Sequence, residues 1–94
     1  MKPVPQDATD ERLLLMLRAL ANPARLHLFH FLRDHDDVHC REMVDDLPLS
    51  QSTVSEHLQR LREAGLIHSD PQSTRGYAID EEAVSWLKER VSSL

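Results

Sequence analysis

Residues 49–67 combine a helical repeat of apolar side chains with a start that is rich in hydroxyl groups. Leu58, Leu61 and Ala64 recur at helical spacing, and Gly65 ends the run. The first two turns hold Ser50, Ser52, Thr53 and Ser55. Serine and threonine are mediocre helix formers, because their hydroxyls compete for backbone hydrogen bonds. This concentration indicates that the start of the helix has a role besides folding.

The helical repeat separates a core face from an outward face. With 100° of rotation per residue, Leu58 and Leu61 fall within about 40° of Val54, so this side faces the core. The opposite side holds Ser52, Glu56, Gln59 and Glu63, with Thr53, Ser55 and Arg60 at its margins. Ser50 is placed to cap the helix. The first turn therefore presents short polar groups outward.

The flanking residues predict a helix-turn-helix followed by a β-hairpin. Residues 40–47 have the apolar spacing of a short helix, and Pro48 prevents its continuation into the next one. Beyond Gly65, residues 66–69 and 77–79 have strand character, and the segment between them is rich in turn-forming residues. The predicted fold class is therefore mainly α with a small β-hairpin wing, a winged helix-turn-helix.

Three further helices complete the expected domain at residues 10–94, after a loose arm at residues 1–9. The first helix is expected to be capped by Asp10 and to end near Ala21, and the second to span residues 23–34 behind Asn22 and Pro23. The second helix is expected to bury Leu26, Leu28, Phe29, Phe31 and Leu32. The last helix is expected to follow Asp80 and to carry an apolar stripe to Leu94.

Composition limits the class of protein. Ninety-four residues suit one domain, and the longest strongly apolar run is too short to cross a bilayer. One cysteine, without a secretory leader, favours a reducing compartment, and we expect a cytoplasmic protein without a membrane partner. The formal net charge of −5 is unusual for a nucleic-acid partner, but residues 50–77 carry balanced charges.

The polar helix start fits the major groove of double-stranded DNA. Glutamine can pair with adenine, and serine and threonine can bond to bases or phosphates. The predicted DNA-binding residues are Ser50, Gln51, Ser52, Thr53, Ser55, Glu56, Gln59, Arg60, Ser73 and Arg75. Ser73 and Arg75 belong to the predicted wing, where an arginine can enter a minor groove or grip phosphate. The competing interpretation is that the hydroxyls only cap the helix.

Several separated stretches resemble the ArsR/SmtB family of winged helix-turn-helix repressors. They are ALANPARL at residues 19–26, LSQSTVSEHL at 49–58, LREAGLI at 61–67 and RGY at 75–77. The resemblance covers nearly the whole chain and implies a homodimer that reads a palindromic operator. It implies base contacts from Gln51, Ser52 and Ser55, while Glu56 departs from the non-acidic residue often found there.

The same resemblance implies that the first and last helices form the dimer interface. This would explain why residues 13–20 are apolar on more sides than one small domain easily buries. The predicted interface residues are Leu13, Leu14, Met16, Leu17, Leu20, Trp86, Leu87 and Val91.

Neither metal site typical of such repressors is matched. The thiolate pair would fall on His39 and Arg41, with Cys40 misplaced between them, and the first histidine of the last-helix site falls on Ala83. We therefore expect no metal and no cofactor, and an unknown effector. The alternative is a metal- or redox-responsive repressor that uses Cys40 and histidines, namely His27, His30, His35 and His39.

The sequence leaves two rival functions open. A winged-helix module that binds protein would suit the negative net charge, but not the polar helix start or the arginine of the wing. An enzyme is not expected, because no phosphate-binding loop, zinc-protease motif or nucleophile arrangement is visible.

Overall fold

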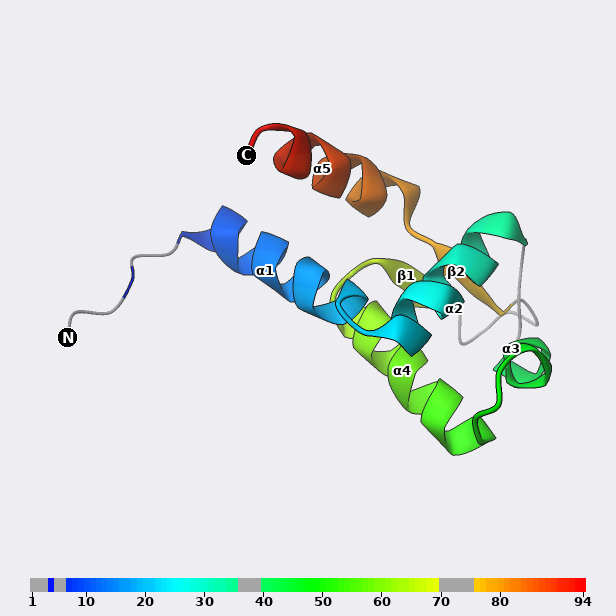
Figure 1. Ribbon diagram of the computed structural model, residues 1–94. Helices are drawn as coiled ribbons and strands as arrows, with labels where there is room; N and C mark the ends of the chain where they lie inside the picture. Colours follow the sequence, from blue (N-terminus) through cyan, green and yellow to red (C-terminus); the bar gives the residue numbers. More distant parts are fainter. Residues whose placement is uncertain (1–3, 5–6, 36–39, 70–75) are drawn as a thin grey trace.

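Helices and one short hairpin make up the computed structural model of this chain (Figure 1). The structure describes residue 4 and residues 7–35, 40–69 and 76–94. In chain order the elements are α1 (Ala8–Leu20), α2 (Pro23–Asp34), α3 (Cys40–Asp46), α4 (Gln51–Glu63), β1 (Ile67–Ser69), β2 (Tyr77–Ile79) and α5 (Glu81–Ser92). This order confirms the predicted winged helix-turn-helix, with most element boundaries within one residue.

The start of α1 differs from the expected one. Asp7, not Asp10, caps the helix, because a carboxylate oxygen of Asp7 accepts a 2.8 Å hydrogen bond from the backbone N–H of Asp10. Ala8 and Thr9 therefore belong to the helix, whereas the prediction assigned them to the arm. Residues 1–3 and 5–6 of that predicted arm lie outside the described residues.

The boundary between α1 and α2 follows the predicted chemistry. The side-chain oxygen of Asn22 accepts a 3.1 Å hydrogen bond from the backbone N–H of Arg25, and Pro23 takes the first helical position. Near the other end of the chain, a carboxylate oxygen of Asp80 accepts a 3.0 Å hydrogen bond from the backbone N–H of Ala83 and caps α5. Both caps were predicted from the sequence and are confirmed.

Helix α4 supplies the centre of the core. Val54, Leu58 and Leu61 are fully buried, as the helical repeat predicted. Helices α1, α2 and α3 and strand β1 all pack against α4. Because its neighbours cover the apolar side of α4, the polar side and the first turn stay at the surface.

A glycine and a short hairpin follow α4. Gly65 has a φ of 80°, a left-handed conformation in which glycine avoids the steric cost that a Cβ brings. Strands β1 and β2 then pair antiparallel, with Ile67 opposite Ile79 and Ser69 opposite Tyr77. The buried ends of this pair, Ile67 and Ile79, join the core and anchor the base of the wing.

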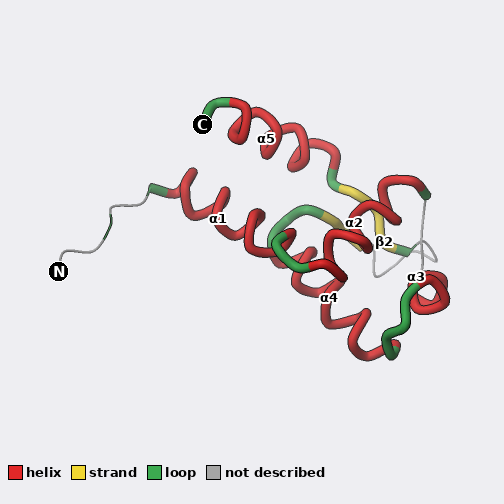
Figure 2. Tube along the Cα trace, viewed as in Figure 1, coloured by secondary structure: helices red, strands yellow, loops and turns green. Residues whose placement is uncertain are grey.

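Helices α1 and α5 lie side by side, apart from the start of α4 (Figure 2). The guanidinium carbon of Arg12 lies 4.1 Å from the ring centre of Trp86, so a cation–π contact joins the two helices. Within the described residues, no helix is long and apolar enough to pass through a lipid bilayer.

One expectation about apolar residues was wrong, because Leu26 was expected in the core but is 40% exposed. Met16, a predicted dimer-interface residue, is fully buried within its own chain. In both cases the neighbouring helices decide which side of an apolar helix is covered, and helical spacing alone does not specify that side.

Candidate nucleic-acid interface

The first turn of α4 lies at the end of the molecule that is remote from α5 (Figure 1). Helix α3 lies next to it and completes the helix-turn-helix. Gln51, Ser52, Ser55 and Glu56 are exposed, while Thr53 is half-buried. The side chains predicted to meet DNA bases therefore stand at the surface of the subunit.

Ser50 organises the start of the helix. Its hydroxyl oxygen accepts a 3.2 Å hydrogen bond from the backbone N–H of Thr53 and donates a 2.9 Å bond to the Thr53 hydroxyl. The Ser52 hydroxyl oxygen lies 3.1 Å from that of Ser50. Ser50 and Thr53 are thus used in capping, as the competing interpretation held. The capping role does not extend to Ser55.

Ser55 and Ser52 remain as the outward hydroxyls. Within the described part of the chain, the Ser55 hydroxyl has no hydrogen-bond partner, and Ser52 contacts only the exposed hydroxyl of Ser50. Both side chains are short, so the helix end can approach a groove closely and still bond to base edges. The backbone N–H groups of the first turn and the helix dipole add attraction for phosphate.

The predicted contacts on the second half of α4 are engaged within the helix. The side-chain amide of Gln59 donates a 3.2 Å hydrogen bond to Glu63, and Arg60 forms a 3.4 Å ion pair with the other carboxylate oxygen of Glu63. Arg60 lies nine residues beyond Gln51, about 14 Å along the helix axis. The structure therefore does not bring Gln59 and Arg60 together with the polar first turn.

The predicted wing contacts, Ser73 and Arg75, lie outside the described residues. The first strand of the hairpin is nevertheless held to α4. A guanidinium nitrogen of Arg62 donates a 3.2 Å hydrogen bond to the hydroxyl of Ser69 at the end of β1. The position of Arg62 in the sequence does not predict this contact, because it depends on how the chain turns at Gly65.

The predicted interface residues divide between the surface and the subunit core. Met16 and Leu87 are buried in the subunit, whereas Leu17 and Val91 are 38% and 43% exposed. Half-buried residues at the edge of the core make up the rest of the set: Leu13, Leu14, Leu20 and Trp86. Leu17 on α1 and Val91 on α5 are therefore the most exposed of the predicted interface residues.

The histidines and acids do not assemble into a metal site within the described residues. No group of three or more potential ligands was found there. His27 instead lies 2.5 Å from a carboxylate oxygen of Asp46 and so joins α2 to α3. His35 stacks on Phe31 at a ring-centre distance of 4.2 Å. His39 and the side chain of Cys40 lie outside the described residues, so the absence of a metal stays a prediction.

The capping role of Ser50 gives a first testable expectation. The Ser50→Ala variant should lose about 1 kcal/mol of unfolding free energy, because the N–H of Thr53 loses its acceptor. Chemical denaturation followed by circular dichroism measures the change. Ser85→Ala, at an exposed position within α5, is the matched control and should unfold at or above the wild-type midpoint. Equal stability of Ser50→Ala and Ser85→Ala would contradict the capping role.

Comparison with known proteins agrees with the site and the fold. Residues 22–69 match the family described as "Bacterial regulatory protein, arsR family". The chain is 34% identical over 79 residues to the HTH-type transcriptional regulator YgaV of Escherichia coli, covering 83% of this chain and 80% of that protein.

Two solved structures show the same fold. An ArsR-like transcriptional regulator from Rhodococcus sp. RHA1 superposes with a TM-score of 0.79 at 21% identity, covering 93% of this chain and 85% of its own. Mb0332 from Mycobacterium bovis is described as a homodimeric winged helix-turn-helix DNA-binding domain. It superposes with a TM-score of 0.70 at 21% identity, covering 98% of this chain and 90% of its own.

These matches favour a DNA-binding regulator over both rival functions, the enzyme and the protein-binding module. The family match spans α2 to β1, which includes the capped, hydroxyl-rich start of α4. The chain belongs to the arsR family of bacterial regulatory proteins and is a DNA-binding transcriptional regulator with a winged helix-turn-helix fold.

Proposed function

We propose that this protein is a repressor that binds a palindromic operator as a homodimer and reads it with the first turn of α4. The observation that carries the proposal is the exposure of Gln51, Ser52 and Ser55 on a helix whose other side is fully buried. A helix fixed in this way presents a constant polar pattern to the major groove.

The homodimer is supported by exposed apolar residues on α1 and α5. Leu17 and Val91 are each more than a third exposed, and such side chains are normally covered when they gather on one surface. The fold neighbour Mb0332 is a homodimer, which supports the same assembly here. Two copies related by a two-fold axis present two recognition helices, and this symmetry requires a palindromic operator.

The function is tested by selecting duplexes from a random DNA pool with the full-length protein and then footprinting the protein on the selected duplexes. We expect an imperfect palindrome that binds two chains, and an affinity that falls linearly with the logarithm of salt concentration. A transcription reporter that carries the selected site should become less active when the protein is present. Selection of no common sequence, or a reporter that becomes more active, would overturn the proposal.

A metal-independent operator complex is expected as well. The described histidines and acids form no group of three ligands, and the thiolate pair is absent from the sequence. Zinc, cadmium or arsenite at one equivalent per chain should therefore leave the complex intact in a gel-shift experiment. Release of DNA at one equivalent of metal, reversed by a chelator, would contradict this expectation. It would instead support a metal-responsive repressor that uses Cys40 and histidines.

A further inference from the structure

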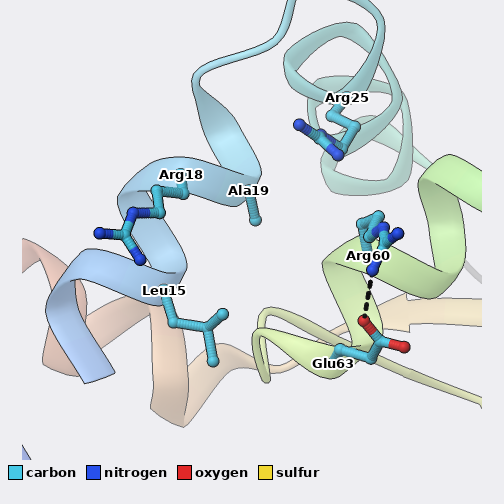
Figure 3. Close-up of a pocket in the computed structure, with 6 residues that line it drawn as sticks. All are labelled: Leu15, Arg18, Ala19, Arg25, Arg60 and Glu63. Carbon is cyan, nitrogen blue, oxygen red and sulfur yellow. Dashed lines mark hydrogen bonds and ion pairs between the residues drawn. The ribbon is translucent and has the colours of Figure 1, made fainter. Parts of the chain in front are cut away.

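A pocket on the side of the molecule has Arg25 and Arg60 on one side and Leu15 and Ala19 on the other, while the guanidinium group of Arg18 points away from both arginines (Figure 3). Its cavity volume is about 140 Å³, and it is lined by Leu15, Arg18, Ala19, Arg25, Arg60 and Glu63. Arg18 comes from α1, Arg25 from α2 and Arg60 from α4. Arg60 lies far from Arg18 and Arg25 in the sequence, so the tertiary fold brings α4 to this pocket.

The pocket has unused capacity to bind an anion. The Nε of Arg25 is buried and has no hydrogen-bond partner within the described part of the chain. A buried donor without an acceptor is unfavourable, and a turn of the Arg25 side chain toward a ligand acceptor would relieve this cost. Arg60 has five N–H donors, and its contact with Glu63 is a long one of 3.4 Å at an exposed site.

The charges in the pocket favour an anion in spite of Glu63. The guanidinium groups of Arg25 and Arg60 and the carboxylate of Glu63 lie on this side of the pocket, which leaves an excess of one positive charge. Both oxygens of Glu63 already accept hydrogen bonds, one from Gln59 and one from Arg60. The planar guanidinium group matches a carboxylate in a two-point hydrogen bond, and this geometry makes arginine selective for such groups.

The remaining wall is apolar and sets the class of ligand. Leu15 is 47% exposed, and Ala19 lies beside it on the same helix. A cavity of about 150 Å³ in another protein accommodates benzene, so the volume here suits a ring or a short alkyl chain of similar size. Apolar contact on one side and guanidinium groups on the other favour a small organic carboxylate over inorganic phosphate.

The pocket is separate from the proposed dimer surface. Leu15 and Leu17 are two residues apart, which places them about 160° apart around the helix. It is also distant from the DNA-reading end, because Arg60 lies about 14 Å along α4 from Gln51. Leu15 and the Arg25 side of the pocket therefore lie away from Leu17 and from the first turn of α4.

We propose that this arginine pocket between α1, α2 and α4 is an effector site for a small organic carboxylate. The carboxylate bonds to Arg25 and Arg60, and the apolar part of the ligand contacts Leu15. A bound ligand therefore connects the recognition helix to α2 and competes with Glu63 for Arg60. The proposed effect of the ligand on operator binding (the regulatory step) rests on the proposed function. Binding of the ligand to the pocket (the binding step) does not.

Titration calorimetry on the full-length protein without DNA tests the binding step with benzoate as the probe. At constant ionic strength we expect one benzoate per chain with a dissociation constant of about 1 mM or lower. Benzyl alcohol lacks the charge, inorganic phosphate lacks the apolar part, and both should bind about tenfold more weakly. No saturation with benzoate, or equal affinity for phosphate, would overturn the carboxylate site.

Single substitutions distinguish benzoate binding in the pocket from a general attraction of benzoate to positively charged side chains. Arg25→Gln should weaken benzoate binding about tenfold, whereas Arg33→Gln, on an exposed position of the same helix, should leave it unchanged. If Arg25→Gln does not fold, Leu15→Asp serves instead, since it adds a negative charge to the pocket at an exposed position. An equal loss of benzoate affinity in the pocket variant and in Arg33→Gln would contradict the proposed site.

A gel shift with the selected operator then tests the regulatory step. Saturating benzoate should change the operator affinity of the wild type at least about threefold, and the change should vanish in Arg25→Gln. Benzoate binding without any change in operator affinity would overturn the effector role. If the protein does not bind the operator, the proposed function fails, but the calorimetric test of benzoate binding is unaffected. The proposed function and the proposed carboxylate site can therefore fail independently.

Discussion

Changing Ser52 and Ser55 together to alanine is expected to weaken operator binding and to leave the subunit at least as stable. Each lost base contact should cost about 1–3 kcal/mol of binding free energy, roughly a fivefold to 150-fold loss of affinity. Neither hydroxyl caps the helix, because Ser50 fills that role. Alanine is the better helix former by about 0.5 kcal/mol per site. Affinity and stability should therefore change in opposite directions.

This opposition makes the experiment decisive. Most variants that weaken DNA binding also destabilise the fold, so a loss of affinity alone does not identify a contact. Gel shifts against the selected operator and against unrelated duplex measure the specific part, and thermal denaturation measures stability. Ser85→Ala, on α5, gains the same helix propensity and should keep wild-type affinity. Unchanged operator affinity in the double variant would rule out groove reading by these hydroxyls.

The architecture of α4 could be predicted from the sequence because local chemistry determines it. The repeat of Val54, Leu58 and Leu61 defines one face, Ser50 defines the start, and Gly65 defines the end. Each of these signals acts within one or two turns of helix, and no distant part of the chain can override them easily. The division of the hydroxyls between capping and exposure, however, required the hydrogen bonds of the structure.

Features that depend on distant neighbours could not be predicted in this way. Met16 and Leu17 are adjacent in an apolar helix, yet the first is fully buried and the second is exposed, because the helices that pack on α1 cover one side only. The arginine pocket is a stronger example. Arg25 comes from α2 and Arg60 from α4, and no sequence spacing predicts that these two side chains lie on one side of the same pocket.

Replacing Leu17 with glutamate is expected to separate the homodimer and, as a consequence, to abolish tight operator binding. In a two-fold interface each substitution occurs twice, so two carboxylates lose their hydration when the subunits meet. The cost of burying an unpaired carboxylate is several kcal/mol, and a rise of about 100-fold or more in the dimer dissociation constant follows. A monomer binds only one half-site, and thus the affinity gained by linking two half-sites is lost.

Sedimentation equilibrium compares the dimer dissociation constants of Leu17→Glu and Leu26→Glu. The comparison distinguishes a loss of the interface from the general cost of adding a surface charge. Leu17 and Leu26 are 38% and 40% exposed, so both glutamates should be equally tolerated by the isolated subunit. Leu26 lies on α2, outside the proposed interface, and its variant should remain dimeric with wild-type operator affinity. Val91→Glu on α5 should behave like Leu17→Glu, because the interface is expected to use both helices. A Leu17→Glu variant that stays dimeric with unchanged operator affinity would place the interface on another face. Because the interface sets the distance between the two recognition helices, the palindromic operator would then need a different spacing of half-sites.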